Sequence, residues 1–520
     1  MHANSAGAVR ITLAPRVDSD VIVVGGGPSG AAAAAHLARA GWQVLLLDRQ
    51  AFPRDKVCGD FVGPVALEEL AALGVTTRAD YRASNIIRRA ALYADGKPLI
   101  ARPMPALDGL PDYGRCIPRL QLDAWILGAA RDAGARVLER TSVLGVDSSG
   151  AVATVRVRTP DGERALTARL VVGADGSSST VARALRGAPP PDASRIIAVR
   201  AYYEGDAGPE DQSDLYFSAE SFPGYYWLFP TGRGIANVGV GMVLETFPPQ
   251  TDHLRDMMLR LVESDPALRQ RLGAARIVGK IVGWPLSTYD PSLPLVGDRI
   301  MLVGDAAGFI NPLNGEGIQY ALLSGRWAAE HAAPCLAHDA CEAAALQPYA
   351  DRVNRELRYD MAFAGLIVEC IRNRHLNTLW LQLLKVIAAR ARVDPRYADV
   401  CGAVLAGLIP SHHALSPHII GRTIDQALFS GVLAAGWTLL RGPRAVLTRT
   451  SSGAAVVRDA AAALARDPAG LLTWLTAVVM QGGELAAEAT RSYLRAMTPR
   501  DHAAPGAPGA VRLTLPAPPS

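Results

Sequence analysis

The residues with the clearest chemical meaning in this sequence form a glycine-rich turn near the N-terminus. Gly25, Gly27, Ser29 and Gly30 belong to the run Gly-Gly-Gly-Pro-Ser-Gly, which has the spacing GxGxxG between an expected strand and an expected helix. Gly25 allows a tight turn, Gly27 lets a pyrophosphate approach the backbone, and Gly30 lets the helix pack closely on the strand. The N–H groups that open such a helix favour negative charge. The spacing therefore predicts a dinucleotide-binding turn.

An acidic residue stands where the second strand of this unit should end. Asp48 closes the run Trp-Gln-Val-Leu-Leu-Leu-Asp and is followed by Arg49. A carboxylate at this place can accept hydrogen bonds from both hydroxyls of a ribose. We therefore expect Asp48, with Arg49 beside it, to bind the adenosine end of the dinucleotide, which the glycine turn alone does not identify as NAD or FAD.

Two later segments combine Asp and Gly at the ends of apolar runs. Asp175 follows Leu-Val-Val-Gly-Ala, and Gly304 and Asp305 follow Ile-Met-Leu-Val. Gly315 and Gly317 come shortly afterwards, in the run Asn-Pro-Leu-Asn-Gly-Glu-Gly-Ile. Asp and Gly are common at strand ends, so each segment alone reads as an ordinary turn. Their order after the GxGxxG turn is harder to explain in that way.

In that order the three segments resemble the FAD fingerprints of the p-hydroxybenzoate-hydroxylase-type flavoproteins, over about residues 18–350. The resemblance implies that FAD is the cofactor. It places Asp305 at the ribityl and pyrophosphate region of FAD, and Asp175 where both FAD and NAD(P)H pass. Arg119 resembles the arginine that opens the helix beside the flavin. A helix beginning near 315–317 would direct its positive end at the flavin N1–C2=O and stabilise the reduced ring.

Two further segments are similar to the geranylgeranyl reductase family. The run Phe-Pro-Arg-Asp-Lys-Val-Cys58-Gly-Asp is similar to that family's Pro-Arg-x-Lys-x-Cys-Gly segment. Tyr225-Tyr-Trp227-Leu-Phe229-Pro matches its Tyr-x-Trp-x-Phe-Pro element, and residues 311–318 fit its Asn-Pro-Leu-x-Gly-Glu-Gly-Ile run. Flavin halogenases carry Trp-x-Trp-x-Ile-Pro at the equivalent place, which argues against halogenation here.

Three of these residues are candidates for the reaction chamber: Cys58, Tyr225 and Trp227. Lys56 and Arg54 precede Cys58 and are expected to lower its thiol pKa, although a small buried residue lining a turn is an equal alternative. Tyr225, Trp227 and Phe229 alternate at strand spacing, so they should share one face. They are either part of a core or, as we favour, one wall of an apolar tunnel over the flavin.

The surrounding sequence predicts an α/β fold with a Rossmann-type FAD-binding domain, an inserted antiparallel β-sheet substrate domain and a C-terminal helical region. Hairpins are expected at Asp95-Gly96 and Asp161-Gly162, and a helix over 118–134. The C-terminal helices should break at Pro395, Pro410, Pro417, Pro443 and Pro468. The expected division is 18–85, 115–185 and 280–350 for FAD, 86–114 and 186–279 for substrate, 351–500 for the helical region, and flexible ends at 1–17 and 501–520.

Composition excludes several classes of function. The 520 residues carry 53 basic and 49 acidic side chains without a basic run, which argues against nucleic-acid binding. Six cysteines form no CxxC pair, and no His, Cys and acid cluster has ligand spacing, so no metal site is expected and a reducing, cytoplasmic compartment fits. No apolar stretch reaches the roughly 20 residues of a membrane span, which leaves peripheral membrane contact open. A homodimer through the helical region is also left open.

The resemblance implies reduction of C=C bonds in a long apolar substrate, with hydride from reduced FAD and a proton from an acid. Two alternatives stay open at this stage: an FAD-dependent monooxygenase, and a polyene cyclase that uses FAD structurally. No second GxGxxG follows a strand. Reductant would therefore come from NAD(P)H bound in a shared cleft or from another reduced protein.

Overall fold

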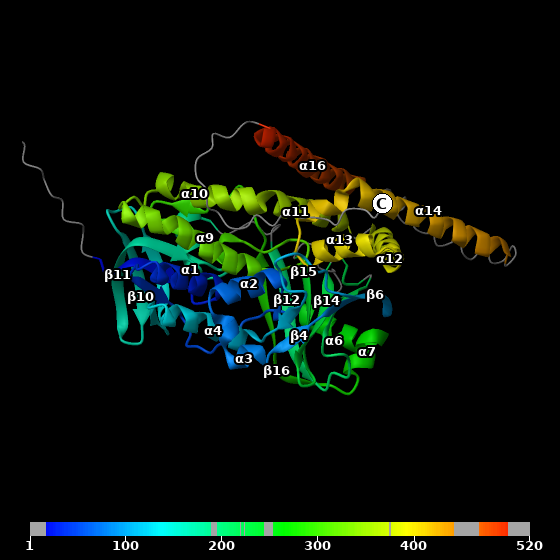
Figure 1. Cartoon of the computed structure of the whole chain (residues 1–520), viewed down its shortest axis with the longest axis horizontal. Coiled ribbons are helices and arrows are strands. Elements are labelled where there is room, and N and C mark those ends of the chain that lie inside the picture. The colour runs from blue at the N-terminus through cyan, green and yellow to red at the C-terminus, as the bar shows by residue number, and fades with distance from the viewer. Residues whose placement is uncertain are drawn as a thin grey trace, which may run out of the picture.

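The computed structural model describes residues 17–188, 195–218, 220–222, 224–243, 253–373, 376–440 and 467–497. Two large sheets lie side by side, and helices cover them along one long side of the molecule (Figure 1). The flexible ends expected from the sequence lie outside the described residues, apart from residue 17.

The first sheet is mostly parallel and brings the three nucleotide-type segments together. Its strand order is β17-β18-β11-β1-β2-β8, and β10 and β9 extend it from β11. The strands are β1 (Ser19–Val24), β2 (Val44–Leu47), β8 (Arg136–Leu138), β9 (Ser142–Asp147), β10 (Ala153–Thr159), β11 (Gly162–Gly173), β17 (Val296–Gly297) and β18 (Ile300–Leu302). Val24 is opposite Gly173, which is opposite Leu302. The glycine turn, the Asp175 turn and the Gly304 turn therefore follow adjacent strand ends.

Small side chains let the first helix pack tightly between this sheet and a later helix. In α1 (Pro28–Arg39), residues 31–35 are alanines that are almost fully buried. The partner helix α9 (Ile318–Ala337) has Gly325 at the contact, where a Cβ would lie 2.4 Å from Ser29 O. A larger residue there would force the helices apart, because protein interiors are close-packed.

The second sheet has the order β16-β12-β15-β14-β13-β5-β6 and is antiparallel except where β13 pairs with β5. Its strands are β5 (Arg89–Ala94), β6 (Lys97–Pro103), β12 (Arg195–Glu204), β13 (Gln212–Phe217), β14 (Tyr225–Gly232), β15 (Ile235–Val243) and β16 (Arg276–Ser287). The hairpin at Asp95-Gly96 is confirmed, with both residues at positive φ between paired Ala94 and Lys97. The hairpin near Asp161 is also confirmed, since Thr159 pairs with Gly162.

A third, small sheet lies against β14 of the second sheet. It contains β3 (Phe61–Val62), β7 (Gly114–Cys116) and β4 (Asn85–Ile87), in the order β3-β7-β4. Because β3 begins one residue after Asp60, this sheet fixes the segment that carries Cys58.

The remaining helices lie around the sheets and in the C-terminal part. They are α2 (Pro64–Ala72), α3 (Ala79–Arg82), α4 (Arg119–Asp132), α5 (Thr180–Arg186), α6 (Leu254–Ser264), α7 (Pro266–Leu272), α8 (Gly304–Ala307), α10 (Ala343–Val353), α11 (Tyr359–Ile371), α12 (Asn377–Val393), α13 (Pro395–Leu405), α14 (Pro417–Leu440) and α16 (Pro468–Met497). Three expected proline breaks are confirmed as first residues of α13, α14 and α16, Pro410 precedes a short turn, and Pro443 lies outside the described residues. Among the helices described, none is long and apolar enough to cross a membrane.

The sequence segments assigned to each domain contribute to the sheets as follows. The ranges 18–85, 115–185 and 280–350 supply the first sheet, and 86–114 and 186–279 supply most of the second. Strand β16 runs across the division at residue 280. The domain boundaries themselves stay predictions.

Candidate functional site

The glycine turn has the shape that close backbone packing requires. Gly25 has φ +106°, and a Cβ on it would lie 2.3 Å from Ala174 O. A Cβ on Gly30 would lie 1.9 Å from Gly25 O, whereas at Gly27 the nearest atom, on Arg54, is 3.6 Å away. No side chain caps the N-terminus of α1 at Gly27. The backbone is therefore open there to an anionic group such as a pyrophosphate.

Asp48 lies directly against this turn at the end of β2. Its Oδ2 accepts a hydrogen bond of 2.7 Å from Gly26 N, and its Oδ1 accepts one of 2.8 Å from Gln50 N. Arg49 is exposed and its guanidinium lies 5.9 Å from the ring centre of Trp284, on β16. Asp48 is thus placed beside the glycine turn, and its ribose contact stays a prediction, as does the cofactor role of Arg49.

The turn after β11 carries two polar side chains, of which Asp175 is hydrogen-bonded within the protein and Ser177 has no partner in the part of the chain that the structure describes. Asp175 accepts hydrogen bonds from Ser179 Oγ, the N-cap of α5, and at 2.6 Å from Thr180 N, the first residue of that helix. Ser177 Oγ is buried and has no partner among the described residues. An orphaned hydroxyl at the end of β11 fits a site that a polar ligand completes.

The third segment folds back onto the first. A Cβ on Gly304 (φ +56°) would lie 2.5 Å from Ser29 Oγ, so these two motif residues are in contact. Asp305 accepts a 2.7 Å hydrogen bond from Lys56 Nζ. Burial raises the Asp305 pKa, but Lys56 and the charge of Arg119 outweigh it and hold the pKa below its usual range.

The turn that precedes α9 lies beside Asp305, and its two glycines were expected at the flavin. Gly317 is the N-cap of α9, where a Cβ would lie 3.7 Å from Asp305 Oδ1. A Cβ on Gly315 would lie 3.2 Å from Tyr225 OH. The helix expected to begin near 315–317 is confirmed. Open glycine backbone, the orphaned Ser177 hydroxyl and an uncapped α1 together fit FAD.

The cationic residues near Cys58 are paired with carboxylates, which corrects one expectation. Arg119 makes a two-point contact with Asp123 at 2.6 and 2.8 Å, and Arg54 binds the same carboxylate at 2.8 Å. Lys56 is bound to Asp305. Burial raises the Cys58 pKa, and of the three cations only Arg119 contributes a lowering effect. The thiol is therefore protonated rather than activated by Lys56 and Arg54.

The aromatic residues of β14 share one face, as the alternation predicts. Ring centres of Tyr225 and Trp227 are 6.4 Å apart, and those of Trp227 and Phe229 are also 6.4 Å apart. Tyr226 and Leu228, on the opposite face, belong to the core under α6 and α7. A Cβ on Gly59 would lie 3.0 Å from the Phe229 ring, so the Cys58 segment lies across this aromatic row. Whether the row forms a tunnel wall stays a prediction.

A buried polar network that the sequence analysis missed holds the row and the Cys58 segment together. Asp60 Oδ2 accepts hydrogen bonds from Tyr202 OH at 2.6 Å and Asn237 Nδ2 at 2.8 Å. Asn237 also donates to Cys58 O at 2.8 Å and accepts from Trp227 Nε1 at 2.9 Å. Asp60 follows the quoted Lys-x-Cys-Gly segment directly, which was the available signal. The sequence carries no such signal for Asn237, which stands in an otherwise apolar strand.

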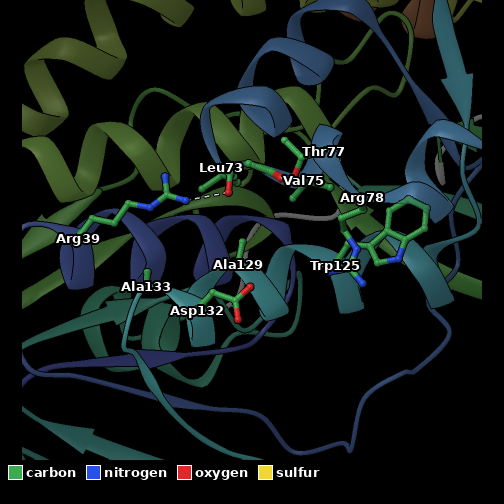
Figure 2. Close-up of a pocket in the computed structure, with 10 residues that line it drawn as sticks. Arg39, Leu73, Val75, Thr77, Arg78, Trp125, Ala129, Asp132 and Ala133 are labelled. Atoms are coloured by element: carbon green, nitrogen blue, oxygen red, sulfur yellow. Dashed lines mark hydrogen bonds between the residues drawn. The ribbon is translucent and has the colours of Figure 1, made fainter.

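One surface pocket is separate from these residues. It has a volume of about 530 Å³ and lies near the C-terminal ends of α1 and α2, beside α4 (Figure 2). Arg39 in its wall donates to Ala72 O and Leu73 O at 2.8 and 2.7 Å, and Arg78 pairs with Asp80. Its cationic groups are thus already engaged.

Comparison with known proteins agrees with the geometry. The family model of the FAD binding domain matches residues 18–237, and that of the geranylgeranyl reductase catalytic domain matches residues 196–282. The menaquinone reductase of Mycolicibacterium smegmatis is 37% identical over 327 residues, which cover 60% of this chain and 76% of that protein. Digeranylgeranylglycerophospholipid reductase 2 of Methanopyrus kandleri is 33% identical and covers 70% of this chain and 90% of its own length.

A solved structure shows the same fold. The geranylgeranyl bacteriochlorophyll reductase-like protein of Thermoplasma acidophilum superposes with a TM-score of 0.59 at 23% identity. The match covers 78% of this chain and 95% of that one. The predicted α/β flavoprotein fold with C-terminal helices is therefore confirmed.

Proposed function

Because this chain belongs to the geranylgeranyl reductase family and is an FAD-dependent oxidoreductase, we propose that it saturates C=C bonds of a long isoprenoid substrate. The observation that carries the proposal is the aromatic row of β14, which faces the Cys58 segment and the turn before α9. An aromatic wall of this kind suits a hydrocarbon chain. The names of the two relatives, both reductases, support a reduction over an oxygenation.

FAD, when bound, supplies the hydride for such a reduction. Asp48 and the open backbone at Gly27 would hold its adenosine and pyrophosphate, and Asp305 would hold the flavin end. The rings of Trp227 and Phe229 would exclude water and align one double bond with the flavin. Correct alignment of reacting groups contributes a large part of such rate enhancements.

The test is product analysis under anaerobic conditions, with parallel reactions in O₂ and with the flavin left oxidised. The full chain is loaded with FAD, reduced with dithionite and mixed with geranylgeraniol or with a menaquinone that carries a polyprenyl tail. Gain of two hydrogens per reacted bond supports the proposal. A product that forms only with O₂ and gains one oxygen selects the monooxygenase, and an isomer of unchanged mass with oxidised flavin selects the cyclase. Parallel assays with NADH and NADPH identify whether either one reduces the flavin.

A second proposal concerns where the protein meets such a substrate. Helices α14 and α16 run along one margin of the molecule, and α14 extends beyond it (Figure 1). On α14 the exposed apolar residues Ile420, Ile424 and Leu428 recur every fourth position, which places them on one face. Exposed Leu472, Leu475, Val479 and Met480 form a similar face on α16.

We infer that these faces dock onto an anionic lipid surface. The sequence between the two helices, residues 441–467, contains five Arg and two acidic residues, and this positive net charge complements anionic headgroups. An amphipathic helix can lie in the interface with its apolar face buried. Binding to phosphatidylglycerol vesicles, weaker on phosphatidylcholine and reduced by Ile424→Gln/Leu428→Gln, supports the inference. A dimer that dissociates in the same variant, with no vesicle binding, would show instead that the face joins two copies.

A further inference from the structure

One carboxyl group in the site has no structural explanation. Glu316 stands between Gly315 and Gly317, in the turn that leads into α9. Its Oε1 is buried and has no hydrogen-bond partner among the described residues. Glu316 as a whole is half-buried, and burying even one carboxyl oxygen without a partner is costly, so the fold alone gives no reason for an acid here.

The Glu316 carboxyl lies between the start of α2 and the turn that follows α13. A Cβ on Gly63 would lie 3.5 Å from Glu316 Oε1, and a Cβ on Gly407 would lie 2.7 Å from Glu316 Oε2. The backbone on either side is glycine, which leaves room for the carboxyl. Tyr225, the first member of the aromatic row, is close enough that Glu316 raises its pKa.

The other candidate groups in this cluster are poorly suited to give up a proton, and the Asp60 carboxyl is already held by Tyr202 and Asn237. Tyr225 OH donates to Asn314 O, and burial raises its pKa further above the usual range. Burial raises the Cys58 pKa, and the Trp227 indole donates to Asn237. Burial raises the pKa of Glu316 to about 8. A carboxylic acid with a pKa in that range is mostly protonated at neutral pH and can still release its proton. Both properties are required of a general acid.

We propose that Glu316 is the proton donor for reduction of the substrate double bond. This role rests on the proposed function. One alkene carbon receives the hydride that the reduced cofactor supplies, and the π bond breaks. The π electrons form a new C–H bond at the other carbon with the proton of Glu316, whose O–H bond breaks. Glu316 is left as a carboxylate, and it regains a proton from water.

The first test measures protonation without turnover. The titratable groups that face Glu316 are the phenols of Tyr225 and Tyr320, and Glu316 raises the pKa of each. No described cation contributes to the pKa of Glu316. Because the folded pKa is raised, the stabilising effect of neutral Glu316 is complete below pH about 4.5 and is lost as pH rises through about 8. The melting temperature of the cofactor-free wild type should fall over that range relative to Glu316→Gln. Equal pH dependence of the two proteins overturns the proposal.

The second test is single turnover of the pre-reduced, FAD-loaded chain with geranylgeraniol. We expect Glu316→Gln to bind FAD normally but form saturated product about a hundredfold more slowly. The wild-type rate should fall as pH rises through about 8, and Glu316→Asp should restore part of the rate that Glu316→Gln loses. Glu68 is an exposed acid on α2, so the control variant Glu68→Gln should match the wild-type rate. A wild-type rate in Glu316→Gln overturns this role alone. A wild type that makes no saturated product overturns the proposed function and this role with it.

Discussion

Asn237 Nδ2 donates a 2.8 Å hydrogen bond to Asp60 Oδ2, although the two residues are 177 positions apart in the sequence. Both are fully buried. The same amide accepts from Trp227, so the pair connects the Cys58 segment to the aromatic row of the second sheet. Asp60 has φ +65°, a left-handed conformation that is uncommon for a residue with a side chain and that its surroundings must hold in place. The relative position of Cys58 and Trp227 thus depends on this buried contact.

The first prediction concerns the pH dependence of stability that Asp60 imposes. Burial raises its pKa to about 6, and the hydrogen bonds from Tyr202 and Asn237 lower it only partly. The folded state therefore holds a proton that the unfolded state releases above pH about 4, so the free energy of unfolding should fall as pH rises through about 6. Two pKa units correspond to about 3 kcal/mol.

Asp60→Asn should remove this component, because an amide keeps the accepting oxygen and does not titrate. Urea unfolding of both proteins at intervals of pH from 4 to 7 measures the difference between them. If that difference is constant across the range, the Asp60 pKa is not raised.

The contrast between the glycine turns and this network explains what sequence reasoning could reach. Gly25, Gly30 and Gly304 are identifiable because a local backbone conformation or close approach excludes other residues. The hairpin at Asp95-Gly96 is predictable for the same reason. By contrast, the partners of Asp60 come from β12 and β15, more than a hundred residues away, and nothing in those strands distinguishes Asn237 from other polar residues. The effect of a cation on a nearby thiol also depends on its ion-pair partner, which the sequence does not show. Lys56 is paired with Asp305 and Arg54 with Asp123, and neither lowers the pKa of Cys58.

A second prediction tests Asp48 as the residue that binds the adenosine ribose. Asp48→Ala should weaken FAD binding by about tenfold to a hundredfold, the effect expected for losing hydrogen bonds to a charged group. The Asp48 carboxylate also accepts a hydrogen bond from Gly26 N, so part of the loss of affinity comes from loosening of the glycine turn. Bound flavin is measured by absorbance after dialysis, and circular dichroism checks the fold. A folded variant that stays fully yellow would refute the assignment.

A third prediction places the flavin beside the start of α9. Gly317 does not need positive φ, and a Cβ there meets Ile310 at 3.4 Å and Asp305 at 3.7 Å, so the protein itself should tolerate a small side chain. Gly317→Val should nevertheless lower FAD affinity and shift the flavin potential. Gly365→Val is the matched control, because a Cβ on Gly365 in α11 meets nothing within 4 Å. Unchanged affinity and potential in Gly317→Val would contradict this placement.

The last prediction concerns Cys58, which we place in the wall of the reaction chamber. Its thiol accepts from Asp60 N at 3.4 Å, and its carbonyl is held by Asn237, so the residue is positioned by the same network that holds Trp227. Burial keeps the pKa of the thiol above its usual range, so we expect slow reaction with iodoacetamide at pH 8 compared with a free cysteine. Cys58→Ser keeps a hydrogen-bonding group of similar size, and Cys58→Ala removes it. If Cys58 contacts the substrate, both variants should keep FAD but change the rate or the number of bonds reduced, with Cys58→Ala affected at least as strongly. Cys370→Ser, on α11, is the control for loss of a thiol elsewhere in the fold. Full activity and an unchanged product pattern in both Cys58 variants would show that the residue only packs against the turn.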